Sequence, residues 1–338
     1  MAADPGSGRD ELIMALFQAA VSRPPGERTA FLDEACAGDS ALRGEVKRRV
    51  EWEERLGGFL LSPLVPRERI DHPFAPGDTV LRGRFRILRL AGEGGMGVVY
   101  EAHDEKLNQR IALKCPRFEF RKRMSPEAMK ALRVTHPHVC RVFEIHTEET
   151  LTGEVDFLTM EFVPGPTLAA RLEAGVPRRW LETTEGQLIA RQICLGLAAV
   201  HGAGIIHRDL KASNVMLARD ASGATRAVIM DFGIAQGMDL FSSATRGCPA
   251  YLAPELWRGQ PATARSDLYA LGVMLYEMAA GQPPFAEGAS WKERLQSRPA
   301  APEVREPLRS AIVRCLEPDP ARRFATAAEL QAALFQRR

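Results

Sequence analysis

The sequence predicts an α+β protein in which a small all-helical domain is followed by a lobe of antiparallel strands and then by a helical lobe. Three observations predict this order. Apolar residues recur at helical spacing in residues 10–57, alternate as in strands through residues 84–161, and return to helical spacing from residue 167 onward. A cleft between two such lobes is a usual place for a ligand.

The predicted domain boundary lies in a proline-rich stretch. Residues 1–58 are expected to form the small helical domain. Residues 59–78 carry scattered prolines and charges, a composition that favours an extended linker. The β-rich lobe is expected over residues 79–163 and the helical lobe over residues 167–338.

Short periodic segments define the elements of both lobes. The first lobe is expected to be an antiparallel sheet with one short helix. The expected strands are 84–91, 97–104, 109–115, 141–147 and 155–161, and the expected helix is 126–134. The expected helices of the second lobe are 167–174, 184–203, 265–280, 305–316 and 326–336.

Composition and charge exclude several classes of function. With 45 basic and 43 acidic side chains, the net charge of +2 gives no overall field toward nucleic acid. The six cysteines show neither a CxxC pair nor zinc spacing, which favours a reducing, cytoplasmic location. No signal peptide and no membrane segment is predicted in these residues.

A glycine-rich hairpin follows the first predicted strand. Gly92, Gly94 and Gly97 fit the pattern G-x-G-x-x-G-x-V, and glycines there let backbone N–H groups approach phosphates. A glycine-rich surface turn and a dinucleotide-binding fingerprint are the alternatives. The second of these needs a following helix, whereas residues 98–100 predict a strand.

Lys114 ends the apolar strand that follows the glycine hairpin, where its ammonium group could pair with phosphate oxygens. An ordinary exposed lysine is the alternative. The combination with the glycine hairpin favours the phosphate-binding interpretation.

Residues 207–214 match H-R-D-L-x-x-x-N in full. In this pattern Asp209 can accept the proton of an attacking hydroxyl, Lys211 can contact a transferring phosphoryl group, and Asn214 can bind a metal ion. A chance cluster of turn residues is the alternative, and the matching blocks that follow in order argue against it.

Asp231 begins a D-F-G block and follows an apolar strand at residues 227–230. Its carboxylate oxygens suit Mg²⁺, so Asp231 is the second predicted metal ligand. Residues 253–255 form an A-P-E block, which closes the segment that begins at Asp231.

With these blocks the chain resembles the protein kinase superfamily over about residues 78–336, and most closely the bacterial eukaryotic-like (Hanks-type) serine/threonine kinases. The resemblance implies a two-lobed fold with an antiparallel β N-lobe and an α-helical C-lobe. It implies ATP as co-substrate with Mg²⁺ or Mn²⁺, and proteins with Ser/Thr acceptors as substrates. It further implies bacterial signal transduction and a homodimer for trans-autophosphorylation.

The resemblance also implies roles for individual residues. ATP would contact Lys114, the backbone of a hinge segment at residues 157–168, and a set of glycine, apolar and hinge residues. This set is Gly92, Gly94, Gly95, Gly97, Val99, Ala112, Met160, Glu161, Val163 and Met216. Asp267 would hold the backbone of the catalytic loop, and Glu255 would pair with Arg323.

The sequence departs from the family pattern at two positions. The glutamate expected to pair with Lys114 is best matched by Glu127, yet residues 125–127 read as the very start of a helix, where an acid can simply complement the helix dipole. Cys248 occupies a position where such kinases usually have threonine, and a thiol is the poorer hydrogen-bond partner. A structural cysteine and a redox-sensitive thiol are both open at Cys248.

Thr245, Ser242 and Ser243 lie on a polar loop ahead of the A-P-E block and are candidate phosphorylation sites. A loop that is simply rich in small polar residues is the alternative.

The predicted function is protein serine/threonine kinase. The competing class is a nucleotide-binding pseudokinase scaffold that acts through the helical front domain, and a third is small-molecule phosphotransfer.

Overall fold

The computed structural model describes the chain in several ranges. These are residues 16, 20, 25–36, 38–40, 42–48, 50, 72–94, 97–116, 132–150, 153–220, 222–231, 249–285 and 299–335. The chain divides into two compact units, Met1–Glu68 and Arg69–Arg338, and each is described here by itself.

The first unit contains helix α2 (Pro25–Ala35) and a further helical stretch at residues 42–48. Pro25 at the first position and an acid in the first turn both favour a helix start. The side chain of Asp39 accepts a hydrogen bond from the backbone N–H of Leu42 at 2.9 Å, which caps the second helical stretch. Among the described residues of this unit, the buried apolar ones are Ala20, Leu32, Cys36, Leu42, Val46 and Val50.

The second unit begins with an antiparallel sheet whose strand order is β1-β2-β3-β4-β6-β5. The strands are β1 (Thr79–Val80), β2 (Phe85–Gly94), β3 (Gly97–Asp104), β4 (Gln109–Pro116), β5 (Val142–Thr150) and β6 (Gly153–Glu161). Alternation along β4 puts Ile111 and Leu113 on one face of the sheet, and Ala112 and Lys114 on the other. Each face packs into a separate apolar cluster.

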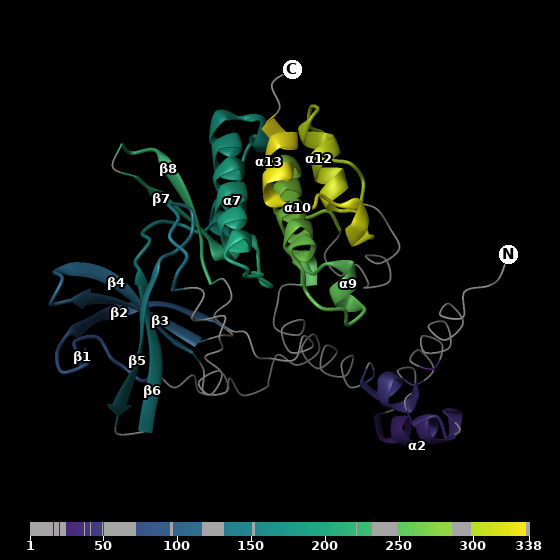
Figure 1. Cartoon of the computed structure of the whole chain (residues 1–338), viewed down its shortest axis with the longest axis horizontal. Helices are drawn as coiled ribbons and strands as arrows, with labels where there is room; N and C mark the ends of the chain where they lie inside the picture. Colours follow the sequence, from purple (N-terminus) through teal and green to yellow (C-terminus); the bar gives the residue numbers. More distant parts are fainter. Residues whose placement is uncertain are drawn as a thin grey trace. The chain divides into compact units, whose positions relative to one another are not determined.

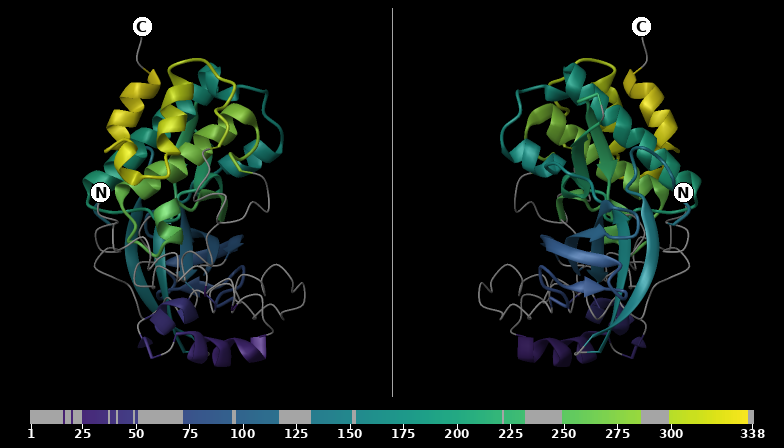
Figure 2. Two further views of the ribbon diagram at one scale, coloured as in Figure 1. Left: turned by 90° about the vertical axis from the view of Figure 1, so that its right-hand side faces the viewer. Right: turned by 90° about the vertical axis from the view of Figure 1, so that its left-hand side faces the viewer.

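Helices make up most of the rest of the second unit (Figures 1 and 2). They are α6 (Leu168–Glu173), α7 (Thr184–Gly202), α9 (Pro254–Trp257), α10 (Ala264–Ala280), α12 (Leu308–Cys315) and α13 (Ala327–Phe335). Short 3₁₀ turns occur at η1 (Trp180–Glu182), η2 (Ala212–Asn214), η3 (Pro249–Tyr251) and η4 (Pro320–Arg322). A two-stranded hairpin, β7 (Val215–Arg219) with β8 (Thr225–Ile229), lies beside α7. This is the predicted architecture of an antiparallel N-lobe and a helical C-lobe.

Helix α10 is the centre of the C-lobe. Every residue from Ser266 to Tyr276 is buried, so this helix is surrounded by other elements instead of showing a polar face. Gly272 lets α12 approach closely, because a β-carbon built on Gly272 would lie 2.5 Å from the β-carbon of Cys315. No helix in the part of the chain that the structure describes is long and apolar enough to cross a membrane.

Most predicted elements lie within a few residues of the observed ones, and the differences are at their ends. The first predicted strand, 84–91, continues to Gly94 because Gly92 to Gly94 keep pairing with β3. The predicted helix 126–134 extended too far at its end, since residues 132–133 form a turn and Val134 packs into an apolar cluster. The earlier part of that helix lies outside the described residues.

The contact between α10 and α12 predicts a specific cost for a small side chain. We expect Gly272→Ala to lower the free energy of unfolding by about 1–3 kcal/mol, because the new methyl group forces the two helices apart. Urea unfolding followed by circular dichroism measures this change.

Gly202→Ala is the matched control, because a β-carbon at Gly202 meets nothing within 4 Å. We expect that variant to be neutral or slightly more stable, since alanine favours a helix over glycine. Equal losses in both variants would contradict the close-packing interpretation.

Candidate active site

A buried carboxylate holds the backbone just ahead of Asp209. The backbone N–H groups of His207 and Arg208 donate to the Asp267 carboxylate at 2.8 Å and 2.9 Å. Asp267 is only 2% exposed. Arg208 has φ of +68°, a left-handed conformation that a non-glycine residue keeps only when its surroundings enforce it. The structure thus places Asp267 where it fixes the entry to the loop.

The Asp209 carboxylate lies between a cation and an amide. The Lys211 ammonium group is 2.8 Å from one carboxylate oxygen. The side-chain nitrogen of Asn214 donates both to that same oxygen, at 3.0 Å, and to the Asp209 backbone carbonyl, at 2.7 Å. This orientation directs the side-chain oxygen of Asn214 away from Asp209. The structure therefore brings together the three residues of the predicted catalytic loop.

Lys114 and Asp231 form an ion pair with a distance of 2.6 Å between the ammonium nitrogen and a carboxylate oxygen. Lys114 is 5% exposed and lies on β4, opposite Val99 of β3 and Leu158 of β6. Burial alone would raise the pKa of Asp231, but the Lys114 charge and hydrogen bond hold that pKa below its usual range. Asp231 is therefore a carboxylate at neutral pH.

The glycines of the β2–β3 hairpin differ in what they require. Gly97 has φ of +144°, and a β-carbon there would lie 2.1 Å from the carbonyl oxygen of Cys115, so only glycine fits. Gly92 and Gly94 have open space where a β-carbon would stand. That space leaves room for a ligand close to the backbone.

Apolar side chains from the sheet and the C-lobe hairpin form one packed cluster, the adenine slot, named for the ligand that the resemblance implies there. Ala112, Met160 and Val163 are buried members of one cluster, and Val99 and Met216 pack against it. All five residues belong to the set that the resemblance predicts to contact ATP. The structure brings them together from β3, β4, β6, the hinge and β7.

Asn214 and Asp231 could hold a divalent cation together. The backbone carbonyl of Asn214 accepts a hydrogen bond from Met230 at 2.8 Å, which places Asp231 next to Asn214. An amide oxygen and a carboxylate are the hard donors that suit Mg²⁺. In the described part of the chain, no three His, Cys, Asp or Glu side chains gather as a metal site.

Glu255 and Arg323 form a buried two-pronged ion pair. The two guanidinium nitrogens lie 2.8 Å from the two carboxylate oxygens, and the hydroxyl of Ser266 donates to Glu255 at 2.8 Å. The remaining donors of Arg323 bind backbone carbonyls, including that of Arg265 at 2.9 Å. The side chains of the pair are 0% and 3% exposed, so this ion pair is a fixed part of the C-lobe core.

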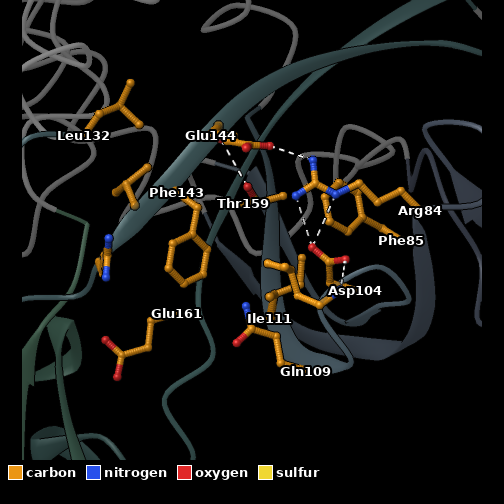
Figure 3. A pocket seen from close by; sticks show the side chains of 13 residues that line it. Arg84, Phe85, Asp104, Gln109, Ile111, Leu132, Phe143, Glu144, Thr159 and Glu161 are labelled. Carbon is orange, nitrogen blue, oxygen red and sulfur yellow. Dashed lines mark hydrogen bonds and ion pairs between the residues drawn. The ribbon is translucent and has the colours of Figure 1, made fainter.

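A separate cavity of about 670 Å³ lies against the N-lobe sheet (Figure 3). Arg84 bridges Asp104 and Glu144 at its edge. Ile111, which lines it, points to the opposite face of the sheet from Lys114. The described lining residues include one candidate of the active site, Glu161, and none of the residues that bind Asp209 or Asp231. Apart from Glu161, this cavity therefore shares no described residue with the active-site candidates.

Comparison with known proteins identifies the family of this chain. The protein kinase domain family matches residues 85–335. The chain belongs to the protein kinase family. It is 34% identical over 274 residues to a probable serine/threonine-protein kinase of Streptomyces coelicolor, which covers 74% of this chain and 39% of the relative. It is 33% identical to serine/threonine-protein kinase PrkC of Bacillus subtilis, over 75% of this chain and 40% of the relative.

The solved kinase domain of Mycobacterium tuberculosis PknI has the same fold, with a TM-score of 0.59 and 26% identity over 77% of this chain and 97% of that domain. This kinase chain spans about two fifths of the length of the curated relatives that it matches.

Several predicted residues lie outside the described part of this kinase chain. They are Gly95, Glu127, Cys248 and the candidate phosphorylation sites Thr245, Ser242 and Ser243.

Sequence reasoning missed two contacts in this kinase chain. It predicted Lys114 and Asp231 separately and did not predict their contact. It also missed the hydrogen bond from the Tyr251 hydroxyl to the Glu277 carboxylate. Glu277 was detectable, because it is an acid that directly follows the apolar run at residues 268–276 of this helix.

Burial of Glu277 in α10 raises its pKa from 4.5 to about 7, although the hydrogen bond from Tyr251 works in the opposite direction. The native state therefore binds a proton that the unfolded state releases. Stability from this group is fully present below pH 4.5 and is lost as pH rises through about 7.

Between about pH 5 and 8 we expect the free energy of unfolding of the wild type to fall by an amount on the order of 1–3 kcal/mol because of Glu277. In Glu277→Gln we expect this fall to be absent. The amide still accepts from Tyr251 but does not titrate. Urea unfolding of wild type and variant at a series of pH values gives the difference. Parallel pH profiles of the two proteins would show that Glu277 does not titrate in this range.

Proposed function

We propose that this chain is an active serine/threonine protein kinase, which transfers the γ-phosphoryl group of ATP to Ser or Thr hydroxyls of proteins. One observation carries the proposal. The Asp209 carboxylate is held by Lys211 and Asn214, in a chain that belongs to the protein kinase family. The relatives from Streptomyces coelicolor and Bacillus subtilis are a probable serine/threonine-protein kinase and a serine/threonine-protein kinase.

Each catalytic residue has a role that its surroundings support. Asp209 is the general base that accepts the proton of the substrate hydroxyl. Lys211, 2.8 Å from Asp209, stabilises negative charge on the transferring group. Lys114 orients phosphate oxygens together with the glycine hairpin. Glu127 is the proposed partner of Lys114. Lys114 would then exchange its contact with Asp231 for a contact with Glu127.

ATP binding is supported by the open backbone of the hairpin and by the adenine slot. Gly92, Gly94, Gly95 and Gly97 would face phosphates, and the backbone groups of Glu161 and Val163 would bind the edge of adenine. Val99, Ala112, Met160 and Met216 would enclose the ring.

A divalent cation, Mg²⁺ or Mn²⁺, would be held by Asn214 and Asp231. The lowered pKa of Asp231 supports this role, because the carboxylate is already ionised. When bound, the cation neutralises charge on the phosphates. The other determinants are structural: Asp267 fixes the catalytic loop, and Glu255 with Arg323 fixes the A-P-E block that closes the segment beginning at Asp231.

The finer assignments are also proposals. The kinase acts in bacterial signal transduction in the cytoplasm and takes proteins as substrates. It phosphorylates Thr245, Ser242 or Ser243 of a second copy in a transient homodimer. Residues 1–58 form a separate helical domain, joined by the linker at 59–78 to the kinase domain at 79–338. Nothing in the comparisons or in the described residues favours a pseudokinase scaffold.

Incubation of the purified chain with Mg·ATP, followed by phosphosite mapping, tests the function. We expect phosphate on Thr245, Ser242 or Ser243. Asp209→Asn should lower the rate by about a hundred- to ten-thousand-fold, because it removes the general base. The same variant should keep its affinity for ATP, since Asp209 does not form the adenine slot.

Two outcomes would contradict the proposal. Equal incorporation by wild type and Asp209→Asn would point to a contaminating kinase. A wild type that binds ATP but transfers no phosphate, either to itself or to a general protein substrate, would favour the scaffold.

A further inference from the structure

One arginine joins three segments that lie far apart in the sequence. Arg226 is on β8, and its guanidinium group forms an ion pair with the Glu161 carboxylate at the end of β6. Another nitrogen of the same group donates to the backbone carbonyl of Pro137 at 3.2 Å. A guanidinium fork suits such a junction, because its donors point in fixed, separate directions.

The backbone that carries Arg226 is itself held from α7. The side chain of Gln192 donates to the carbonyl of Thr225 at 3.1 Å and accepts from the N–H of Ala227 at 2.7 Å. These two contacts bracket Arg226 on both sides. The guanidinium group therefore extends from a fixed base, which lowers the entropy lost when it binds Glu161.

The loop ahead of β5 is fastened to the same strand. The N–H of Ile229 donates to the carbonyl of His138 at 2.9 Å, and the N–H of Cys140 donates to the carbonyl of Ile229 at 2.8 Å. The His138 ring nitrogen is 3.0 Å from the carbonyl of Ala227. Backbone hydrogen bonds thus join β8 to the loop ahead of β5, and the ion pair of Arg226 with Glu161 adds a contact from β8 to the hinge.

The junction connects the two sides of the adenine slot. In the β7–β8 hairpin Arg226 lies opposite Ala218, and Met216 lies opposite Val228. Met216 belongs to the slot on the C-lobe side, and Glu161 begins the hinge on the N-lobe side. A contact between Arg226 and Glu161 therefore sets how far the hinge lies from the hairpin that carries Met216.

We propose that Arg226 is a positioning residue that fixes the width of the adenine slot through Glu161, and so sets the affinity of the kinase for ATP. The inference rests on the proposed function, because it assumes that ATP is the ligand of the slot. The side chains of Arg226 and Glu161 are 26% and 27% exposed, so the pair is partly shielded from solvent and salt. Such a pair has a measurable coupling, unlike most fully exposed ones.

The test measures the Kd of Mg·ATP by calorimetry and the kcat and KM for ATP on a general protein substrate. Arg226→Ala should raise both Kd and KM by roughly three- to tenfold, the range expected for contacting charged residues, and change kcat less than about twofold. Glu161→Gln should act in the same direction, because it removes the charge and leaves the hinge backbone intact. Arg226→Lys should recover part of the affinity.

A charge exchange and a matched control separate positioning from general stability. Arg226→Glu combined with Glu161→Arg should bind ATP more tightly than either single change, because it restores the pair. Arg219→Ala is the control, since Arg219 is on the same hairpin and hydrogen-bonds within it, to Gly223 and Thr225. We expect that variant to keep the wild-type Kd.

Three results would overturn the proposal. These are an unchanged Kd in Arg226→Ala, an equal change in Arg219→Ala, and a double exchange that is no better than the single changes. A wild type that binds ATP but transfers no phosphate would contradict the proposed function alone. The Kd values of the variants would then still test the contact of Arg226 with Glu161. A wild type that binds no nucleotide would overturn both.

Discussion

The buried carboxylate of Asp267 is the contact on which the rest of the active site depends. It accepts hydrogen bonds from the backbone of His207 and Arg208, and the ring of His201 lies 2.7 Å away. A buried charge is costly unless several donors satisfy it, so the loop cannot leave Asp267 without a large loss of free energy. The position of Asp209, directly after these residues, thus follows from how α10 is packed.

The same turn of α10 also fixes the segment that precedes it. Ser266, next to Asp267, donates to Glu255, which is paired with Arg323 from a segment far along the chain. Such a buried pair adds little net stability, but losing one partner typically costs about 3–5 kcal/mol. Its effect is therefore to hold position. The hinge junction at Arg226 would extend the same principle to the nucleotide side of the cleft.

Local patterns in the sequence predicted much of this structure. Alternation gave the bounds of β3, and helical periodicity gave α10 to within one residue. Motif spacing identified Lys114, Asp209 and Asp231 as candidates. The contact of Lys114 with Asp231, like that of Arg226 with Glu161, was not predictable, because each joins distant segments whose approach is set by tertiary packing. No local periodicity encodes such pairs.

We infer that Asp267 holds the catalytic loop in its active geometry. The most direct test of this role is the kcat of an Asp267→Asn variant, measured together with the KM for ATP and the melting temperature. In the native protein both carboxylate oxygens of Asp267 accept hydrogen bonds from backbone N–H groups. In this variant the amide nitrogen would replace one of these acceptors and would face an N–H donor. We predict a kcat lower by roughly a hundredfold, as expected for a displaced catalytic group, with the KM for ATP close to wild type. A folded variant with wild-type kcat would contradict the account.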